Sequence, residues 1–320
     1  MKTITILIPC YNEENSIDLL YEHLQKVISQ LQEYNFQVLL VNDGSKDNTL
    51  AKMQELNEKD PAVSYLSLSR NFGKENAMLA GLDYADGDAV ILMDADLQDP
   101  PELIPQMLQE WEKGYDDVYA RRRTRAGETW FKKASAHWYY RILQMFSDID
   151  IPADVGDFRL LDRQAVDALC LLREKQRYTK GLFSWIGYNK KELLFDREPR
   201  AVGSTKMNFL KLFGLAVDGI TSFSVAPLRL ASVLGLLISS VAFLYLLYVV
   251  GKTLLFGDPV AGYPSMISII LFIGGIQLVV LGIIGEYVGR IFYEAKRRPD
   301  YLVSEYNGKK IYQERSVKRE

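Results

Sequence analysis

The last third of this chain of 320 residues carries two long stretches that contain no charged residue. The first has 22 residues between Arg229 and Lys252, and the second has 27 residues between Asp258 and Glu286. A helix needs about 20 apolar residues to cross the hydrocarbon core of a bilayer. The pattern therefore predicts two transmembrane helices within residues 227–290. The alternative for each stretch is a helix buried in the core of a protein.

The charges around these stretches predict how they cross the membrane. The connector, Lys252–Pro264, carries a single basic residue, whereas the chain from Arg290 to its end carries nine. Basic residues are retained on the cytoplasmic side of membrane proteins. We therefore expect a multi-pass protein of the plasma (inner) membrane, with both termini in the cytoplasm and residues 291–320 as a basic cytoplasmic tail.

Residues 207–226, just before the first stretch, have an amphipathic pattern. Their apolar residues recur at helical spacing, and they are Phe209, Leu210, Phe213, Val217 and Ile220. Lys211 and Asp218 place charge between them. The pattern predicts a juxtamembrane helix that lies on the membrane surface. The alternative is an ordinary helix that packs on a protein core.

Residues 1–206 show a different pattern, in which strand-like and helix-like segments alternate. Strand-like apolar runs occur at 3–8, 36–41, 63–68 and 89–93. Between them lie segments whose apolar residues recur every three or four positions. This alternation predicts parallel βαβ units with helices on both faces of the sheet. Further along we expect helices near 102–113, 128–147 and 163–173, and strands near 117–121, 157–161 and 190–196.

Polar residues follow the fourth strand-like run, at the edge where parallel sheets bind their ligands. Asp94 and Asp96 come directly after the run at 89–93, and their spacing by two residues permits both carboxylates to face the same way. Such oxygen ligands suit Mg²⁺ or Mn²⁺, which share them with substrate phosphates. Two aspartates alone are also compatible with a solvated turn, but the strand end favours a metal site.

The ends of the first and second runs also carry informative residues. Asp43 closes the second run, and its carboxylate is placed to accept a hydrogen bond from a nucleotide base. The alternative is a helix cap, a role that Ser45 or Asp47 also suits. The first run ends in the sequence Pro-Cys-Tyr-Asn-Glu-Glu and has no glycine-rich turn. This disfavours a dinucleotide site of the Rossmann type.

Composition excludes several other classes of protein. The net charge of −3 argues against a general nucleic-acid binder, and two histidines cannot build a histidine-rich metal site. The two cysteines, Cys10 and Cys170, form no CxxC pair. They fit a reducing compartment and exclude a disulfide framework.

Several motifs along the chain occur in the order found in one known family. They are Pro9–Glu14, Val41–Thr49, Arg70–Glu75, Met93–Glu102, Gly156–Leu160, Arg200–Lys206, Phe223-Ser224 and Pro227-Leu228-Arg229. With the paired apolar stretches, they resemble family 2 glycosyltransferases over nearly the whole chain. More narrowly, they resemble the polyprenyl-phosphate glycosyltransferases, namely the dolichol-phosphate mannose synthases and the bacterial undecaprenyl-phosphate glucosyltransferases of the GtrB type.

The resemblance implies a fold and a role for each matching residue. Residues 1–206 would form a cytoplasmic α/β domain of the GT-A fold, Rossmann-like with a mostly parallel sheet. The nucleotide would be held by Pro9, Tyr11, Glu13, Asp43 and Asp94, and the metal, Mg²⁺ or Mn²⁺, by Asp94, Asp96 and Gln98. Asp96 and Asp157 would be the catalytic residues. The phosphate-binding residues would be Arg121, Arg122, Arg123, Arg125, Arg200 and Lys206, with Arg122, Arg123, Arg200 and Lys206 assigned to the acceptor.

The reaction implied by the resemblance is an inverting transfer of a hexose to undecaprenyl phosphate for modification of a cell-envelope glycan. Glucose from UDP-glucose is the favoured sugar, and mannose, an N-acetylhexosamine or an aminoarabinose derivative are alternatives. A non-catalytic two-span scaffold or flippase subunit is a further alternative. A processive synthase is disfavoured, because its QxxRW-type motif is replaced by Gln176-Arg177-Tyr178. Small residues at Gly274-Gly275, Gly282, Gly285 and Gly289 would permit a homo-oligomer.

Overall fold

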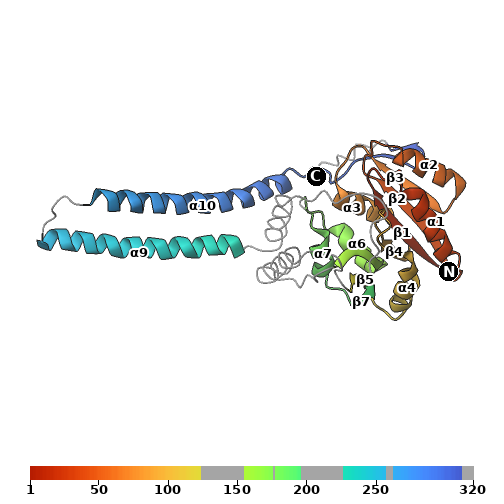
Figure 1. The fold of residues 1–320 in the computed structure, drawn as a ribbon, viewed down its shortest axis with the longest axis horizontal. Helices are drawn as coiled ribbons and strands as arrows, with labels where there is room; N and C mark the ends of the chain where they lie inside the picture. The colour runs from red at the N-terminus through yellow and green to blue at the C-terminus, as the bar shows by residue number, and fades with distance from the viewer. Residues whose placement is uncertain (124–154, 176, 196–225, 257–261, 312–320) are drawn as a thin grey trace, which may run out of the picture.

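The computed structural model describes residues 1–123, 155–175, 177–195, 226–256 and 262–311. They form a layered α/β domain and a pair of long helices that run side by side away from it (Figure 1). The helix expected near 128–147 lies outside the described residues, as does almost all of the amphipathic segment 207–226.

Within the described residues, nine strands form one sheet in the order β7-β5-β6-β4-β1-β2-β3-β8-β9. The strands are β1 (Lys2–Cys10), β2 (Tyr34–Asn42), β3 (Val63–Leu68), β4 (Ala89–Leu92), β5 (Asp117–Arg122), β6 (Val155–Asp162), β7 (Lys190–Phe195), β8 (Val303–Tyr306) and β9 (Lys309–Lys310). The central strands β4, β1, β2 and β3 are parallel, as the alternating pattern predicted. The sheet as a whole is mixed, which corrects the expected mostly parallel sheet. The reason is that β6 runs antiparallel to β4 and β5, and β8 runs antiparallel to β3.

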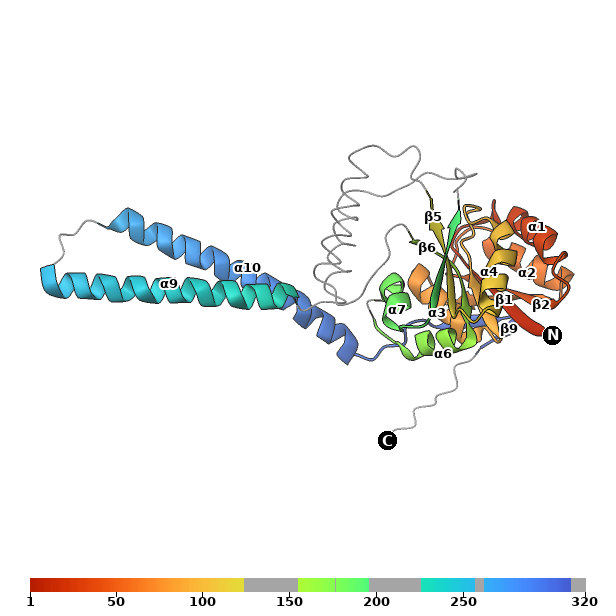
Figure 2. The same ribbon diagram turned by 90° about the horizontal axis from the view of Figure 1, so that it is seen from below.

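Helices cover both faces of the sheet (Figure 2). They are α1 (Ile17–Ile28), α2 (Thr49–Lys59), α3 (Lys74–Tyr84), the short 3₁₀ helix η1 (Pro101–Leu103), α4 (Ile104–Glu112), α6 (Arg163–Leu171) and α7 (Thr179–Trp185). The strand β1 shows why two layers form. Ile4, Ile6 and Ile8 pack with α1, α2 and α4, whereas Leu7 packs on the other face with α3, α6 and α7. Alternate side chains of a strand point to opposite faces, so this buried strand needs a helical layer on each side.

Local sequence explains the buried face of one helix and the start of another. The apolar residues of α1 recur at three- and four-residue spacing, and Ile17, Leu20, Leu24 and Val27 are buried. The helix α6 begins after Asp162, whose carboxylate accepts a hydrogen bond from the backbone N–H of Gln164. The predicted helices near 102–113 and 163–173 are confirmed as α4 and α6, and the predicted strands near 117–121, 157–161 and 190–196 as β5, β6 and β7.

The chain after the long helices returns to the sheet, which the sequence analysis did not expect. The strand β8 pairs with the edge of β3, and Val303 is buried in the same core as Leu66 and Leu68. The backbone N–H of Tyr65 donates to the side chain of Asn307, 2.8 Å away. Part of the tail is therefore built into the α/β domain.

The two long helices are α9 (Ala226–Phe256) and α10 (Tyr263–Ala295), and they contact each other. Their large apolar side chains, such as Leu236, Leu244, Leu278 and Leu281, are mostly exposed. Among the described residues, one segment is long and apolar enough to cross a bilayer, Phe272–Ala295. The apolar helical segment found within α9, Ala231–Tyr245, is shorter. The second predicted span therefore stays a prediction.

Candidate active site

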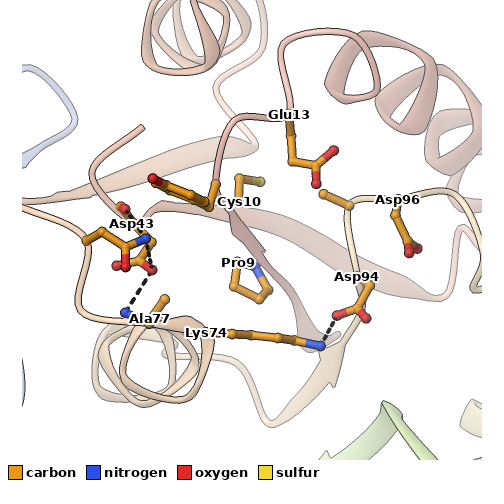
Figure 3. Close-up of a pocket in the computed structure, with 12 residues that line it drawn as sticks. Pro9, Cys10, Glu13, Asp43, Lys74, Ala77, Asp94 and Asp96 are labelled. Carbon is orange, nitrogen blue, oxygen red and sulfur yellow. Dashed lines mark hydrogen bonds and ion pairs between the residues drawn. The ribbon is translucent and has the colours of Figure 1, made fainter. Parts of the chain in front are cut away.

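A cavity of about 350 Å³ opens at the carboxyl ends of β1, β2 and β4 (Figure 3). Six residues that the sequence analysis assigned to the site line it, namely Pro9, Tyr11, Glu13, Asp43, Asp94 and Asp96. They are brought together because parallel neighbouring strands end at the same edge of the sheet. The roles of these residues stay predictions, but their common location is a property of the structure.

The loop after β1 is fixed to the loop after β2. Asn12 has a left-handed backbone, with φ of 57°, and its side-chain oxygen accepts a hydrogen bond from the backbone N–H of Lys46. The backbone N–H of Glu13 donates to the hydroxyl of Thr49, 2.8 Å away. Burial raises the pKa of Glu13, and the carboxylates of Asp96 and Asp94 raise it further. The cavity therefore favours cations near Glu13.

Asp43 anchors the loop that leads into α3. Its carboxylate accepts hydrogen bonds from the backbone N–H groups of Phe72 and Gly73, at 2.7 and 3.0 Å, and from the side chain of Asn71, at 2.9 Å. Burial raises the pKa of Asp43, and the two backbone hydrogen bonds counteract that shift. Asp43 lines the cavity and also fixes the residues that begin α3.

Gly44 permits the close approach of this loop to β2. A Cβ atom at this position would lie 2.3 Å from the carbonyl carbon of Arg70 and 2.5 Å from the backbone nitrogen of Asn71. The residue also has a φ of +62°, which L-residues with a side chain adopt only at a cost. A glycine is required here for two independent reasons.

A tight turn after β4 holds the two aspartates. The backbone N–H of Asp94 donates to Asp99, and the backbone N–H of Gln98 donates to Asp96, 3.2 Å away. Burial raises the pKa of Asp99 to about 7, and the charges of Asp94 and Asp96 contribute. Leu97 lies in this turn with a φ of 60°. The turn therefore concentrates negative charge at the carboxyl end of β4.

Gln98 takes part in this turn in a way that the sequence did not reveal. It is buried, at 7% exposure, and it is not among the residues that line the cavity. Its backbone N–H orients Asp96. Its assignment as a metal ligand stays a prediction.

Lys74 connects the aspartate turn to a residue of β6. Its ammonium group lies 2.6 Å from Asp94 Oδ1 and 2.5 Å from Asp157 Oδ2. Figure 3 shows its side chain crossing the cavity from α3 to Asp94. Burial alone would lower the pKa of Lys74, but Asp94 and Asp157 outweigh it and raise the pKa. Lys74 lies within the Arg70–Glu75 motif, but the sequence predicted no role for this residue.

Asp157, the predicted catalytic residue, lies close to the start of β6. Its side chain is 11% exposed, and its Oδ1 atom is buried without a hydrogen-bond partner among the described residues. Burial would raise the pKa of Asp157, but the positive charges of Lys74, Lys180 and Arg159 hold it below its usual range. Asp157 is therefore a stable carboxylate at neutral pH.

A buried ion pair lies next to Asp157 in the sheet. Arg159, two residues further along β6, bonds Asp117 of β5 at 2.9 Å, and both side chains are almost fully buried. The guanidinium also stacks on Phe183 of α7, with 3.6 Å between its central carbon and the ring centroid. Breaking one partner of such a pair leaves a buried charge, so these contacts fix β6 relative to β5.

The residues present fit a divalent cation that is shared with a substrate. Asp94 and Asp96 offer carboxylate oxygens to one cavity, and hard cations prefer oxygen. In the described part of the chain, no group of three or more histidine, cysteine, aspartate or glutamate residues forms a complete cage. Two protein carboxylates leave coordination positions for phosphate oxygens and water, which is the usual arrangement for Mg²⁺ with phosphate substrates.

Three of the predicted phosphate-binding arginines lie at the same edge of the sheet. They are Arg121, Arg122 and Arg123, at the end of β5, which runs antiparallel to β6. Arg121 forms an ion pair with Glu192 of β7 at 3.0 Å. The other predicted phosphate ligands, Arg125, Arg200 and Lys206, lie outside the described residues.

Two family models match this chain. The glycosyl transferase family 2 model matches residues 5–170, which include the cavity, Lys74 and Asp157. A model of the GtrB C-terminal hairpin matches residues 226–291, which correspond to α9 and most of α10.

Known proteins align with nearly the full length of the chain. An uncharacterized glycosyltransferase of Synechocystis sp. is 48% identical over 305 residues, which cover 95% of this chain and 96% of that protein. The uncharacterized glycosyltransferase YkcC of Bacillus subtilis is 46% identical and covers 98% of both chains. The bactoprenol glucosyl transferase of Shigella phage SfV is 43% identical, covering 94% of this chain and 97% of that protein. These matches confirm the family resemblance, and the chain belongs to glycosyl transferase family 2.

Proposed function

We propose that this protein transfers a hexose, glucose from UDP-glucose in the first instance, to a polyprenyl phosphate, with inversion at the anomeric carbon. The observation that carries the proposal is the cavity at the strand ends, where Asp43, Asp94 and Asp96 converge and Lys74 links Asp94 to Asp157. The Shigella phage SfV relative is a bactoprenol glucosyl transferase, which supports glucose as the sugar and a bactoprenol lipid as the acceptor.

In this proposal, the nucleoside lies against Pro9, Tyr11, Glu13 and Asp43, and the diphosphate lies near Asp94 and Asp96. A bound Mg²⁺ or Mn²⁺ ion, held by Asp94 and Asp96, would supply positive charge beside the leaving diphosphate. The chain itself orients the donor, since hydrogen bonds fix the loops after β1, β2 and β3 to one another, and a hydrogen bond from Asp94 to Asp99 closes the turn after β4. A fixed polar frame of this kind needs no reorganisation during the reaction.

The acceptor in this proposal is a phosphate monoester, whose second pKa is about 6. It is largely a dianion at neutral pH, so it can attack the anomeric carbon without losing a proton. Asp157 does not then need to act as a base, and its lowered pKa is unsuited to that role. We assign Asp157 to stabilising the positive charge that develops at the anomeric carbon.

The substrates also imply a place for the site. A polyprenyl chain stays in the bilayer, and a nucleotide sugar stays in water. We propose that α9 and α10 both span the membrane and that the α/β domain lies at its cytoplasmic face. The exposed apolar side chains of both helices and the basic residues Lys296, Arg297 and Arg298 after α10 support this arrangement. Arg122, Arg123, Arg200 and Lys206 are the proposed ligands of the lipid phosphate.

The test is a screen of nucleotide sugars with undecaprenyl phosphate in detergent, with transfer of radiolabel to extracted lipid as the readout. We expect UDP-glucose to give the highest rate, and chelation of divalent cations to abolish transfer. Asp96→Asn should lose transfer, whereas Asp18→Asn, an exposed aspartate that pairs with Lys52, should keep it. A high rate with another sugar would change the donor, and no transfer from any nucleotide sugar would favour the scaffold alternative.

A further inference from the structure

The ammonium group of Lys74 occupies a place where a cation is expected. It lies 2.6 Å from Asp94 Oδ1 and 2.5 Å from Asp157 Oδ2, at ion-pair distance from both. Asp94 is also one of the two carboxylates proposed to hold the divalent ion. A carboxylate proposed as a metal ligand is therefore already paired with a cation of the protein itself.

The position of Lys74 is set by the backbone around it. Lys74 is the first residue of α3, and the two residues before it are held by hydrogen bonds to Asp43. From this fixed backbone position the side chain of Lys74 extends across the cavity, which it helps to line (Figure 3). An ammonium on such an anchored stem competes with any ion that approaches Asp94.

The surroundings of Asp157 show how the Lys74 ammonium could also contact a bound substrate. Its Oδ1 atom is buried without a partner in the described residues, and Lys74 is bonded to its Oδ2 atom. An ammonium has three N–H donors, and two of them are used by Asp94 and Asp157. One donor remains for a new acceptor, and a phosphate oxygen of a bound donor substrate is an acceptor of the right charge.

We propose that Lys74 is a positioning residue that makes divalent-metal binding depend on the nucleotide. Without nucleotide, its ammonium neutralises Asp94 and weakens binding of the metal. When the diphosphate enters the cavity, it supplies new acceptors to the ammonium and new oxygen ligands to the metal. The metal and the donor then bind together, with each raising the affinity of the other. This inference rests on the proposed function, in which Asp94 and Asp96 hold the metal.

The test measures Mn²⁺ binding by electron paramagnetic resonance in the full-length protein in detergent, with and without UDP and without any acceptor. In the unmodified protein we expect weak Mn²⁺ binding alone and much tighter binding with UDP. Lys74→Gln should bind Mn²⁺ alone about tenfold more tightly, because a positive charge beside Asp94 is gone. The gain on adding UDP should shrink accordingly. Lys74→Arg, which keeps a cation, should remain close to the unmodified protein.

Lys59→Gln is the matched control, since Lys59 pairs with Glu55 on an exposed helix face at the same 2.6 Å distance. It should leave Mn²⁺ binding unchanged. Lys74→Gln removes an ion-pair partner of the buried Asp157, so circular dichroism must show that this variant folds. Should it not fold, the double variant Lys74→Gln with Asp157→Asn frees Asp94 without leaving Asp157 charged, and it should show the same tighter binding.

Equal Mn²⁺ affinities of the unmodified protein and folded Lys74→Gln, both without UDP, would overturn the inference. Asp96→Asn separates this failure from failure of the proposed function. If UDP promotes Mn²⁺ binding and Asp96→Asn abolishes it, the metal assignment stands whatever the Lys74 variants do. If the unmodified protein binds no Mn²⁺ even with UDP, the metal assignment and the inference both fail.

Discussion

Single residues in and next to the cavity differ sharply in their surroundings, although many of them are carboxylates. Asp43 is bound by backbone N–H groups, Asp94 by an ammonium, and Asp99 by the backbone of the turn that it closes. The pKa of Asp99 is raised to about 7, whereas that of Asp157 is lowered. These different surroundings give identical side chains different roles within one site.

Gly44→Ala should destabilise the domain by at least about 2 kcal/mol, because the left-handed backbone disfavours alanine and the new methyl group meets the backbone of Arg70. Thermal or urea unfolding measures this change. Gly114→Ala is the matched control, since Gly114 has a φ of +93° but nothing within 4 Å of the added atom. It should cost roughly 1 kcal/mol. Equal losses at both sites would mean that the contact with Arg70 contributes nothing.

Asp157→Asn should lower the transfer rate on the order of a hundredfold, because it removes a charge that stabilises the transition state. The pKa of Asp157 is depressed, so its ionised form is complete at neutral pH and is lost only when the pH falls below that lowered pKa. The rate between about pH 6 and pH 9 should therefore show no acidic limb from this residue. A limb that the unmodified enzyme has and Asp157→Asn lacks would identify Asp157 as a base.

For single residues, the sequence located those that directly follow strands but not those whose role depends on tertiary packing. Asp43, Asp94 and Asp96 are found by reading strand ends, because the edge of a parallel sheet gathers them without further information. Lys74 and Asp99 have no such signal, since their importance arises from the distance of Lys74 to Asp157 and from a turn that buries Asp99. Those distances depend on tertiary packing.

Among the secondary-structure elements, β8 and β9 make the chain after α10 a part of the α/β domain. They extend the sheet past β3, whose edge would otherwise present unpaired backbone groups. Further contacts fix the same segment, since Glu305 accepts a hydrogen bond from Tyr65 and Lys175 forms an ion pair with Asp300 at 2.6 Å. The chain after α10 is thereby attached to the rest of the α/β domain at Asp300 and again at Glu305.

Removing residues 302–320 should therefore destabilise the α/β domain and promote aggregation, because it uncovers the edge of β3 and the core around Val303. The measurement is the melting temperature together with light scattering. Removing only residues 312–320 leaves both strands in the chain and is the matched control. If both truncations behave like the full chain, β8 contributes nothing to stability.

The parallel strands and their helices were predictable because their signals are local and repeated. The direction of β6 was not, since an apolar strand reads the same in either orientation. The hairpin of β8 and β9 did carry a signal, Asn307-Gly308, with φ values of 46° and 77°. Asn-Gly between two short runs is typical of a tight hairpin, but runs of four and two residues are too short to stand out.

For the whole molecule, the long helices are inserted between two parts of one sheet. The chain leaves the α/β domain before α9 and re-enters it after α10 (Figure 1). A simple truncation at residue 227 would therefore remove β8 and β9 together with the helices. The role of the helices has to be tested by an internal deletion.

Replacing residues 226–295 by a flexible linker should keep both terminal strands and preserve binding of UDP, measured by calorimetry. Transfer to undecaprenyl phosphate should fall strongly, because the protein no longer resides with its lipid. Transfer to a short, water-soluble prenyl phosphate should persist and is the internal control. Full activity on the long lipid would show that the helices are not needed to reach it.

The pairing of β8 with β3 also fixes the order in which parts of the protein can fold during synthesis. Tyr65 and Glu305, which bond across the β3–β8 junction, are 240 residues apart in the chain. At about 5–20 residues per second, roughly 10 to 50 seconds pass between the synthesis of the two partners. During that interval the edge of β3 is open while α9 and α10 are being made. The catalytic domain is completed only after the helices have left the ribosome, so its final closure follows their synthesis.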